Sequence, residues 1–268
     1  MPGRSIVRRL LDWRDSLVLR KHRISELTWQ RVVHDIPLLQ RLSRNERSRL
    51  RVISSLFLHK KVLVGVDDLE LDDYKRTVIA AQACVLILNL SLDYFDGWVE
   101  VIVYPGAFIV PTMQHDSSGV VHQEQHALGG EAWSRGPVIL SWEDVQPAHP
   151  QHGNHGVNVV LHEFAHKLDL LNGAANGMPP LHQKMDRQRW TEDFTHAYES
   201  LLRHIEGGHR GRIDPYAVES PAEFFAVVTE FFFERPETLH RELPAVYAQL
   251  VQYYRQDPRS RCNRVAHQ

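Results

Sequence analysis

The fold and the chemistry of this chain are both indicated by one stretch, residues 157–171, with the sequence VNVVLHEFAHKLDLL. Its apolar residues recur at helical spacing, and Gly173 follows at a position where helices often end in a left-handed turn. His162 and His166 are four residues apart, so a helix places both imidazoles on one face. The stretch therefore predicts a helix that presents two histidines together.

These two histidines belong to the pattern H-E-x-x-H, in which Glu163 follows the first of them. Two imidazoles at this spacing can bind a single zinc ion. Zinc lowers the pKa of a bound water toward neutrality, and a nearby carboxylate can then take a proton from that water as it attacks a peptide bond. The pattern predicts one Zn²⁺ per chain, held by His162 and His166, with Glu163 as the base. The alternative is an amphipathic helix with two surface histidines.

A catalytic zinc usually has three protein ligands, so a further His, Asp or Glu is required. In metzincins the motif continues to a glycine and a third histidine, but this chain has Asp169 and Asn172 at those positions. That subclass is excluded. The remaining candidates are carboxylates of residues 214–227, DPYAVESPAEFFAV, which precede and begin a predicted helix.

Spacing alone leaves the third ligand open. Ser220, Pro221 and Glu223 have the pattern of an N-cap, a proline at the first helical position and a capping-box glutamate, which explains Glu223 without a metal. Glu230, two turns further along the same face, is a rival ligand or a partner that orients a histidine. Asp169 is a second candidate for that orienting role, or simply a charge on the helix face.

Composition narrows the class of protein. The chain has 268 residues, 43% hydrophobic and 24% charged, which is typical of a globular protein with one main core. A formal net charge of -2 argues against direct nucleic-acid binding. No run of apolar residues is long enough to predict a membrane span. Two cysteines, Cys84 and Cys262, do not indicate a disulfide framework, and we expect a cytoplasmic protein.

The rest of the pattern predicts an α+β fold: a zincin-like metallopeptidase with a small mixed sheet, an H-E-x-x-H helix and a helical N-terminal part. Strands are expected at residues 62–66, 98–104, 108–110 and 137–142, and helices across 28–60 with a break at Pro37, through 79–88, and at 190–205, 220–234 and 243–254. We expect residues 1–74 to be a helical extension packed on a catalytic domain of residues 75–268. A loop with His149, His152 and His155 is left out of the site.

The chain resembles the Mlc titration factor A family of zinc metallopeptidases, which are related to the catalytic domain of anthrax lethal factor. The likeness extends well beyond the zinc motif and is weakest in residues 1–29 and 174–212. It rests on Asp96-Gly97, Tyr104-Pro105, Gly136 to Leu140 with Trp142, His162 to Asp169, Asn172-Gly173, Tyr216-Ala217, Pro221-Ala222-Glu223 with Phe225-Ala226-Val227, Tyr254 and Gln256-Asp257-Pro258.

This resemblance implies that Glu223 is the third zinc ligand and that Tyr216 hydrogen-bonds the oxyanion of the tetrahedral intermediate. Without it, Tyr216 would be an ordinary turn aromatic. The resemblance also implies aminopeptidase-like action on short peptides and binding of the Mlc transcriptional repressor. The chain is then either a peptidase that also binds this repressor, or chiefly a regulatory binding protein whose peptidase activity is secondary.

Overall fold

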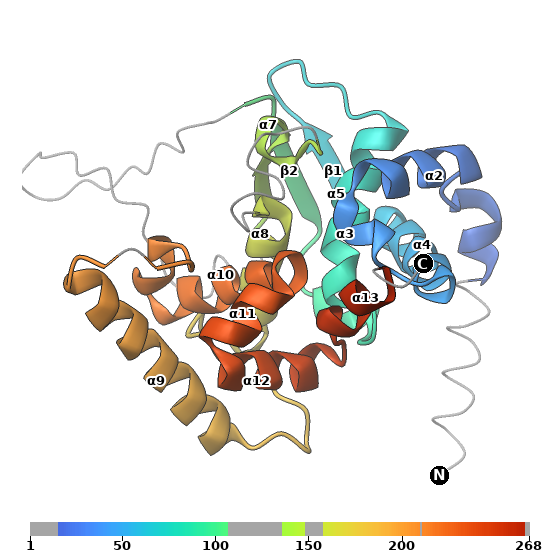
Figure 1. The fold of residues 1–268 in the computed structure, drawn as a ribbon. Helices are drawn as coiled ribbons and strands as arrows, with labels where there is room; N and C mark the ends of the chain where they lie inside the picture. Colours follow the sequence, from blue (N-terminus) through green and yellow to red (C-terminus); the bar gives the residue numbers. More distant parts are fainter. Residues whose placement is uncertain (1–15, 107–135, 148–157, 210, 266–268) are drawn as a thin grey trace, which may run out of the picture.

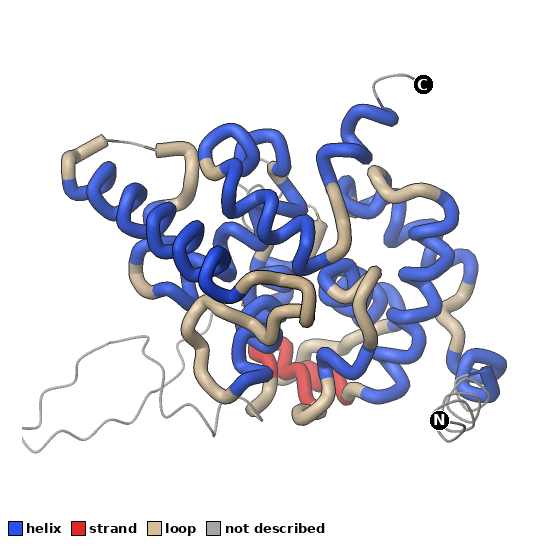
Figure 2. Tube along the Cα trace, turned by 90° about the horizontal axis from the view of Figure 1, so that it is seen from below, coloured by secondary structure: helices blue, strands red, loops and turns tan. Residues whose placement is uncertain are grey.

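The computed structural model describes residues 16–106, 136–147, 158–209 and 211–265. Within these ranges the chain is mostly helical and contains one small three-stranded sheet (Figure 1). Figure 2 shows the strands, in red, near one side of the molecule, with helices forming most of the remainder. The predicted combination of helices and a small sheet is confirmed.

After a helical segment at residues 16–22, the first part of the described chain forms α2 (Glu26–Asp35), α3 (Pro37–Gln40) and α4 (Arg44–Lys60), and α2 and α4 contact α5 (Asp73–Leu86). The break predicted at Pro37 is confirmed, because this proline takes the first position of α3, where its missing N–H breaks no helical hydrogen bond. Ser43 caps α4 and forms a capping box with Glu46. Local capping chemistry thus sets where these helices begin.

The sheet has the strand order β1-β2-β3, made of β1 (Val62–Gly65), β2 (Glu100–Tyr104) and β3 (Val138–Ser141). Both pairs are parallel, with Val64 opposite Ile102 and Ile102 opposite Ile139. The predicted mixed sheet is therefore wrong for the strands that the structure describes. Parallel neighbours need a long crossover, and the residues between β1 and β2 supply one that contains α5 and the 3-10 helix η1 (Leu92–Phe95). The strand expected at residues 108–110 lies outside the described residues.

Helix α8 (Val159–Asp169) lies in the middle of the core and contacts β3, α5 and α10. Its Phe164 is fully buried, with its ring centroid 5.8 Å from that of Phe57, 5.1 Å from Phe95 and 5.6 Å from Trp98. Side chains from the first helices and from the later part of the chain join one hydrophobic core. The boundary expected at residue 74 stays a prediction.

The later part of the chain adds a short helix after β3 and a mainly helical C-terminal half. These elements are α7 (Trp142–Val145), η2 (Leu170–Asn172), α9 (Arg187–Glu206), η3 (Pro215–Val218), α10 (Pro221–Glu234), α11 (Pro236–Glu242), α12 (Pro244–Tyr254) and α13 (Pro258–Val265). Helix α10 is largely apolar and buried, and it packs along α8. Among the helices that the structure describes, none combines the length and the apolar character needed to cross a membrane.

Candidate metal centre

Helix α8 brings the two predicted histidines together. Asn158 caps it by accepting a hydrogen bond from the N–H of Leu161 at 3.1 Å, so the helix begins close to where the pattern predicts. It ends in η2 and the left-handed Gly173, at φ 100°, as expected. One turn of helix separates His162 and His166, and their Nε2 atoms lie 3.1 Å apart. Both side chains are less than one-fifth exposed.

Helix α10 adds a carboxylate from the opposite side. An oxygen of Glu223 lies 2.9 Å from Nε2 of His162, and its other oxygen lies 3.4 Å from Nε2 of His166. The Ser220 hydroxyl does cap α10, accepting from the N–H of Glu223 at 3.1 Å. The helix-cap interpretation therefore holds for Ser220, while the carboxylate of Glu223 faces the imidazoles.

The donor set fits a divalent metal ion. The nearest ligand atoms of His162, His166 and Glu223 all lie within 4.8 Å of one another. Two ligands about 2.05 Å from one zinc ion at a tetrahedral angle are about 3.3 Å apart, and the three separations given above are close to that spacing. Two imidazoles and a carboxylate leave a fourth position open, as in catalytic zinc sites. These three residues could hold a metal ion.

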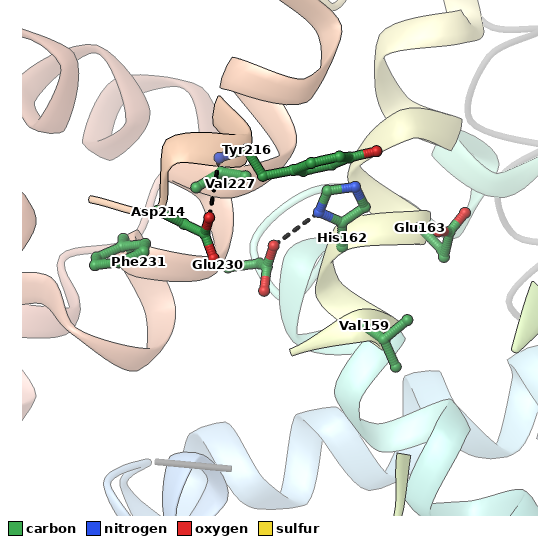
Figure 3. A pocket seen from close by; sticks show the side chains of 8 residues that line it. All are labelled: Val159, His162, Glu163, Asp214, Tyr216, Val227, Glu230 and Phe231. Carbon is green, nitrogen blue, oxygen red and sulfur yellow. Dashed lines mark hydrogen bonds and ion pairs between the residues drawn. The ribbon is translucent and has the colours of Figure 1, made fainter. Parts of the chain in front are cut away.

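Glu230 holds His162 from the other side of its ring. Its Oε1 lies 2.7 Å from Nδ1 of His162 (Figure 3). Its Oε2 accepts a hydrogen bond from the N–H of Asn158. A carboxylate that accepts from Nδ1–H leaves the lone pair on Nε2, where Glu223 and His166 lie. Glu230 is therefore placed to orient the histidine rather than to compete with Glu223 as a ligand.

The charges around His162 favour a cation at this point. Burial lowers the pKa of His162, but hydrogen bonds to Glu223 and Glu230 outweigh burial and raise that pKa to about 10. Burial raises the pKa of Glu223, and hydrogen bonds with His162 and His166 outweigh this and lower it to about 2. The oxygens that attract a proton to Nε2 would equally attract a metal ion.

A cavity of about 260 Å³ opens beside His162 and Glu163 (Figure 3). Glu163 projects from α8 next to His162, and Tyr216 lies across from it on η3. The side chains of Val159, Val227 and Phe231 supply an apolar wall. The cavity is large enough for a side chain or short backbone segment of a substrate, and one candidate ligand, His162, is among the residues that line it.

Tyr216 faces the histidines from a separate element. The Asp214 carboxylate caps η3, accepting from the N–H of Tyr216 at 2.9 Å. The phenol ring centroid lies 6.0 Å from that of His162, and 42% of the residue is exposed. Burial, and then the nearby Glu223 and other carboxylates, raise the pKa of Tyr216 to about 12. The resemblance was the one signal in the sequence for this residue.

Asp169 is buried at the end of α8, and its role in orienting a histidine stays a prediction. It is fully buried, so it is no charge on an exposed helix face. Its Oδ2 accepts a hydrogen bond from the N–H of Gly177 at 2.8 Å, and within the described part of the chain its Oδ1 has no hydrogen-bond partner. Burial raises the pKa of Asp169 to about 6, although the backbone hydrogen bond from Gly177 opposes this. Its hydrogen bond is to the backbone of a loop, while His166 lies close enough to lower its pKa by charge attraction. His149, His152 and His155 lie outside the described residues.

Comparison with known proteins identifies a family of metallo-peptidases. The sequence model of the family described as glucose-regulated metallo-peptidase M90 matches residues 10–255. Mlc titration factor A of Salmonella arizonae is 39% identical over 84% of this chain and 90% of its own length. Mlc titration factor A of Escherichia coli O9:H4 (strain HS) is 37% identical over 89% of each chain, and an uncharacterized protein of Synechocystis is 38% identical over 94% of this chain and 91% of its own.

Proposed function

The chain belongs to the family of glucose-regulated metallo-peptidases M90, and from this premise we propose that it is a zinc-dependent peptidase. The observation that carries the proposal is the convergence of His162, His166 and Glu223, from two separate helices, at distances suited to one ion. In this proposal these three side chains are the zinc ligands. Zinc, when bound, would acidify a coordinated water and polarise the carbonyl of the peptide bond.

The protein's own groups then move the proton and stabilise charge. We assign Glu163, one of the residues that line the cavity beside His162, as the base: it takes a proton from the attacking water and later delivers it to the departing amine. Tyr216 donates its phenolic O–H to the substrate oxygen on which negative charge develops. A phenol is protonated at neutral pH, so this donor is available throughout the reaction.

The edge of the sheet offers a place for an extended peptide. Among the described strands, β3 pairs only with β2, and α8 packs directly against β3. A peptide added alongside β3 would gain main-chain hydrogen bonds and pass close to the metal ligands. Proline at a β3 position whose N–H points away from β2 is expected to raise KM for peptides; unchanged kinetics would remove this binding mode.

Short peptides cleaved from the N-terminus are the substrates that we propose, by analogy with the family. The names of the relatives favour a second function as well. Two proteins with 37–39% identity are called Mlc titration factor A, and we propose that this chain also binds the Mlc repressor. The alternative is that repressor binding is the main function and hydrolysis is secondary. We propose a cytoplasmic location, where such a repressor acts and where the free thiol of Cys84 would stay reduced.

Elemental analysis combined with peptide hydrolysis tests the enzyme directly. We expect about one zinc per chain in the purified protein and cleavage of peptide amides with a free N-terminus in preference to acetylated ones. Glu163→Gln should keep its zinc but lose at least about 100-fold in kcat, because a general base is removed. Glu219→Gln, an exposed carboxylate near Tyr216, is the matched control and should keep full activity.

Repressor binding is separated from hydrolysis by the same variant. If both functions exist, Glu163→Gln binds the repressor as tightly as the wild-type protein while its kcat for peptides is at least about 100-fold lower. Wild-type protein that binds no zinc, or that cleaves no peptide of the panel when loaded with zinc, would contradict the proposed peptidase. Absence of binding between the purified proteins would contradict the second function alone.

A further inference from the structure

A single buried glycine connects the two helices that carry the candidate ligands. The exposed residues 171–176 that follow α8 lead to Gly177, which is buried although its preceding neighbours are not. The N–H of Gly177 donates to Oδ2 of Asp169 at the end of α8, at 2.8 Å. Its carbonyl accepts a hydrogen bond from Nε1 of Trp190 on α9, at 3.1 Å. Gly177 therefore has both of its backbone polar groups bonded to buried side chains.

The same glycine lies against the first residue of α10. A Cβ added at Gly177 would lie 2.5 Å from the carbonyl oxygen of Pro221 and 3.1 Å from its carbonyl carbon. The residue also has φ +77°, a conformation that side chains disfavour. Only glycine lets the loop approach the helix backbone this closely. Pro221 is two residues before Glu223, so the contact acts on the turn that carries the carboxylate ligand.

We propose that this clasp, defined as Asp169, Gly177 and Trp190 together with the backbone of Pro221, positions Glu223 relative to His162 and His166. The inference rests on the proposed metal site and gives a role to Asp169 that is distinct from ligand binding or proton transfer. Asp169 and Gly177 are positioning residues: neither belongs to the candidate ligand group or to the residues that line the cavity. They set how closely the end of α8 and the start of α10 approach each other.

The chain supplies a matched control for this proposal. Gly173 also has a positive φ, at +100°, and belongs to the same connection, but a Cβ there meets nothing within 4 Å. Gly173→Ala and Gly177→Ala therefore both introduce an unfavourable backbone conformation, and only the second forces the loop or α10 to move. If the two variants differ in zinc affinity, the cause is the contact with Pro221 and not the unfavourable backbone conformation, which both variants share.

The experiment measures metal binding in the full chain by competition with a chromophoric chelator, and ligand geometry by the visible absorption spectrum of the Co²⁺ form. Gly177→Ala is expected to bind Zn²⁺ about 10- to 100-fold more weakly, the range for groups that support metal ligands, with a changed Co²⁺ spectrum. Gly173→Ala should keep the wild-type affinity and spectrum. Wild-type behaviour of Gly177→Ala, or an equal loss in both variants, would overturn the proposal.

A second pair of variants decides the matter if Gly177→Ala does not fold. Asp169→Asn keeps an oxygen that can accept from Gly177, whereas Asp169→Ala removes it. We expect weaker Zn²⁺ binding in Asp169→Ala and recovery of most of the affinity in Asp169→Asn. Equal affinity in the two would contradict the clasp. A wild-type protein without any zinc affinity would instead contradict the proposed function, so the two failures are distinguishable.

Discussion

The two ends of the α8–α10 pair are held together in different ways. Where α8 begins, side chains join the helices directly: the Asn158 amide donates to Glu234 at 2.9 Å and to Gln82 of α5 at 2.8 Å, and its N–H donates to Glu230. Where α8 ends, the helices meet through a loop, from Asp169 through Gly177 to the backbone of Pro221. The candidate metal ligands lie between these two attachments.

We infer that the two ends control different features of the site: one the orientation of the His162 ring, the other the distance between Glu223 and the histidines. The Asn158 end is a buried hydrogen-bond network, and through Glu230 it fixes which nitrogen of His162 faces the site. The clasp end uses the shape of the backbone, and we infer that it determines how near Glu223 comes to the histidines. Substitutions at the first end should leave buried polar groups unpaired, which costs about 1–3 kcal/mol each. Substitutions at the clasp end should change the distance between Glu223 and the two histidines.

Removal of the carboxylate between the two ends should have the largest effect. Glu223→Gln replaces an anionic ligand by a neutral amide and keeps the N-cap bond from Ser220 to its backbone. We expect a loss of zinc affinity greater than the roughly 10- to 100-fold typical of supporting groups, with peptide hydrolysis lost in parallel. Elemental analysis after dialysis measures it. A variant that keeps stoichiometric zinc would show that Glu223 is not a ligand.

Removal of the metal by a chelator tests whether the Asn158 end or the clasp end of the α8–α10 pair depends more on the bound ion. An ion at 100 times its Kd stabilises the folded state by about 2.7 kcal/mol, so EDTA should lower the melting temperature of the wild-type protein but not of Glu223→Gln. Native-state hydrogen exchange should then rise more at the amide of Gly177 than at that of Leu161. Both amides donate to a protein side chain, but Gly177 lies in a loop and Leu161 in the first turn of a buried helix. Equal exchange rates at both amides would contradict this order.

Glu230→Ala breaks the link between the Asn158 end and the histidine. Nδ1 of His162 and the N–H of Asn158 both lose their acceptor. We expect zinc affinity to fall about 10- to 100-fold, because the ring is no longer held in one orientation and tautomer. Glu234→Ala is the control, as it removes a partner of Asn158 only. If the two variants bind zinc equally well, Glu230 has no orienting role.

Asn158→Ala should have the smallest effect on the metal. It removes the N-cap of α8, and such caps contribute about 0.5–2 kcal/mol to stability. Urea unfolding measures this cost, and zinc affinity should change much less than in Glu230→Ala. Ser43→Ala removes the cap of α4, away from the site, and should cost less stability, because the Asn158 side chain also bonds to Gln82 and Glu234. A large loss of zinc affinity in Asn158→Ala alone would show that both ends control spacing.

Much of the site could be predicted because it depends on local geometry. The four-residue interval between His162 and His166 places both rings on one face of any α-helix, and Ser220 and Pro221 mark the start of α10 wherever that helix packs. The positions of the three described strands also follow from short β-branched runs. Their common direction does not, because strand direction depends on how the long connections cross the sheet, and for these three strands the predicted mixed sheet was wrong.

The sequence by itself determined the pair of histidines, the helix ends and the short list of acidic partners. Only the tertiary structure decided which carboxylate meets which ring nitrogen. Glu223 and Glu230 lie on one face of α10, two turns apart, and Asp169 lies just beyond His166. Their contacts depend on the antiparallel packing of α8 against α10 and on the loop at Gly177. Local spacing defines where side chains point along one helix, whereas contacts between helices arise only when the whole core packs.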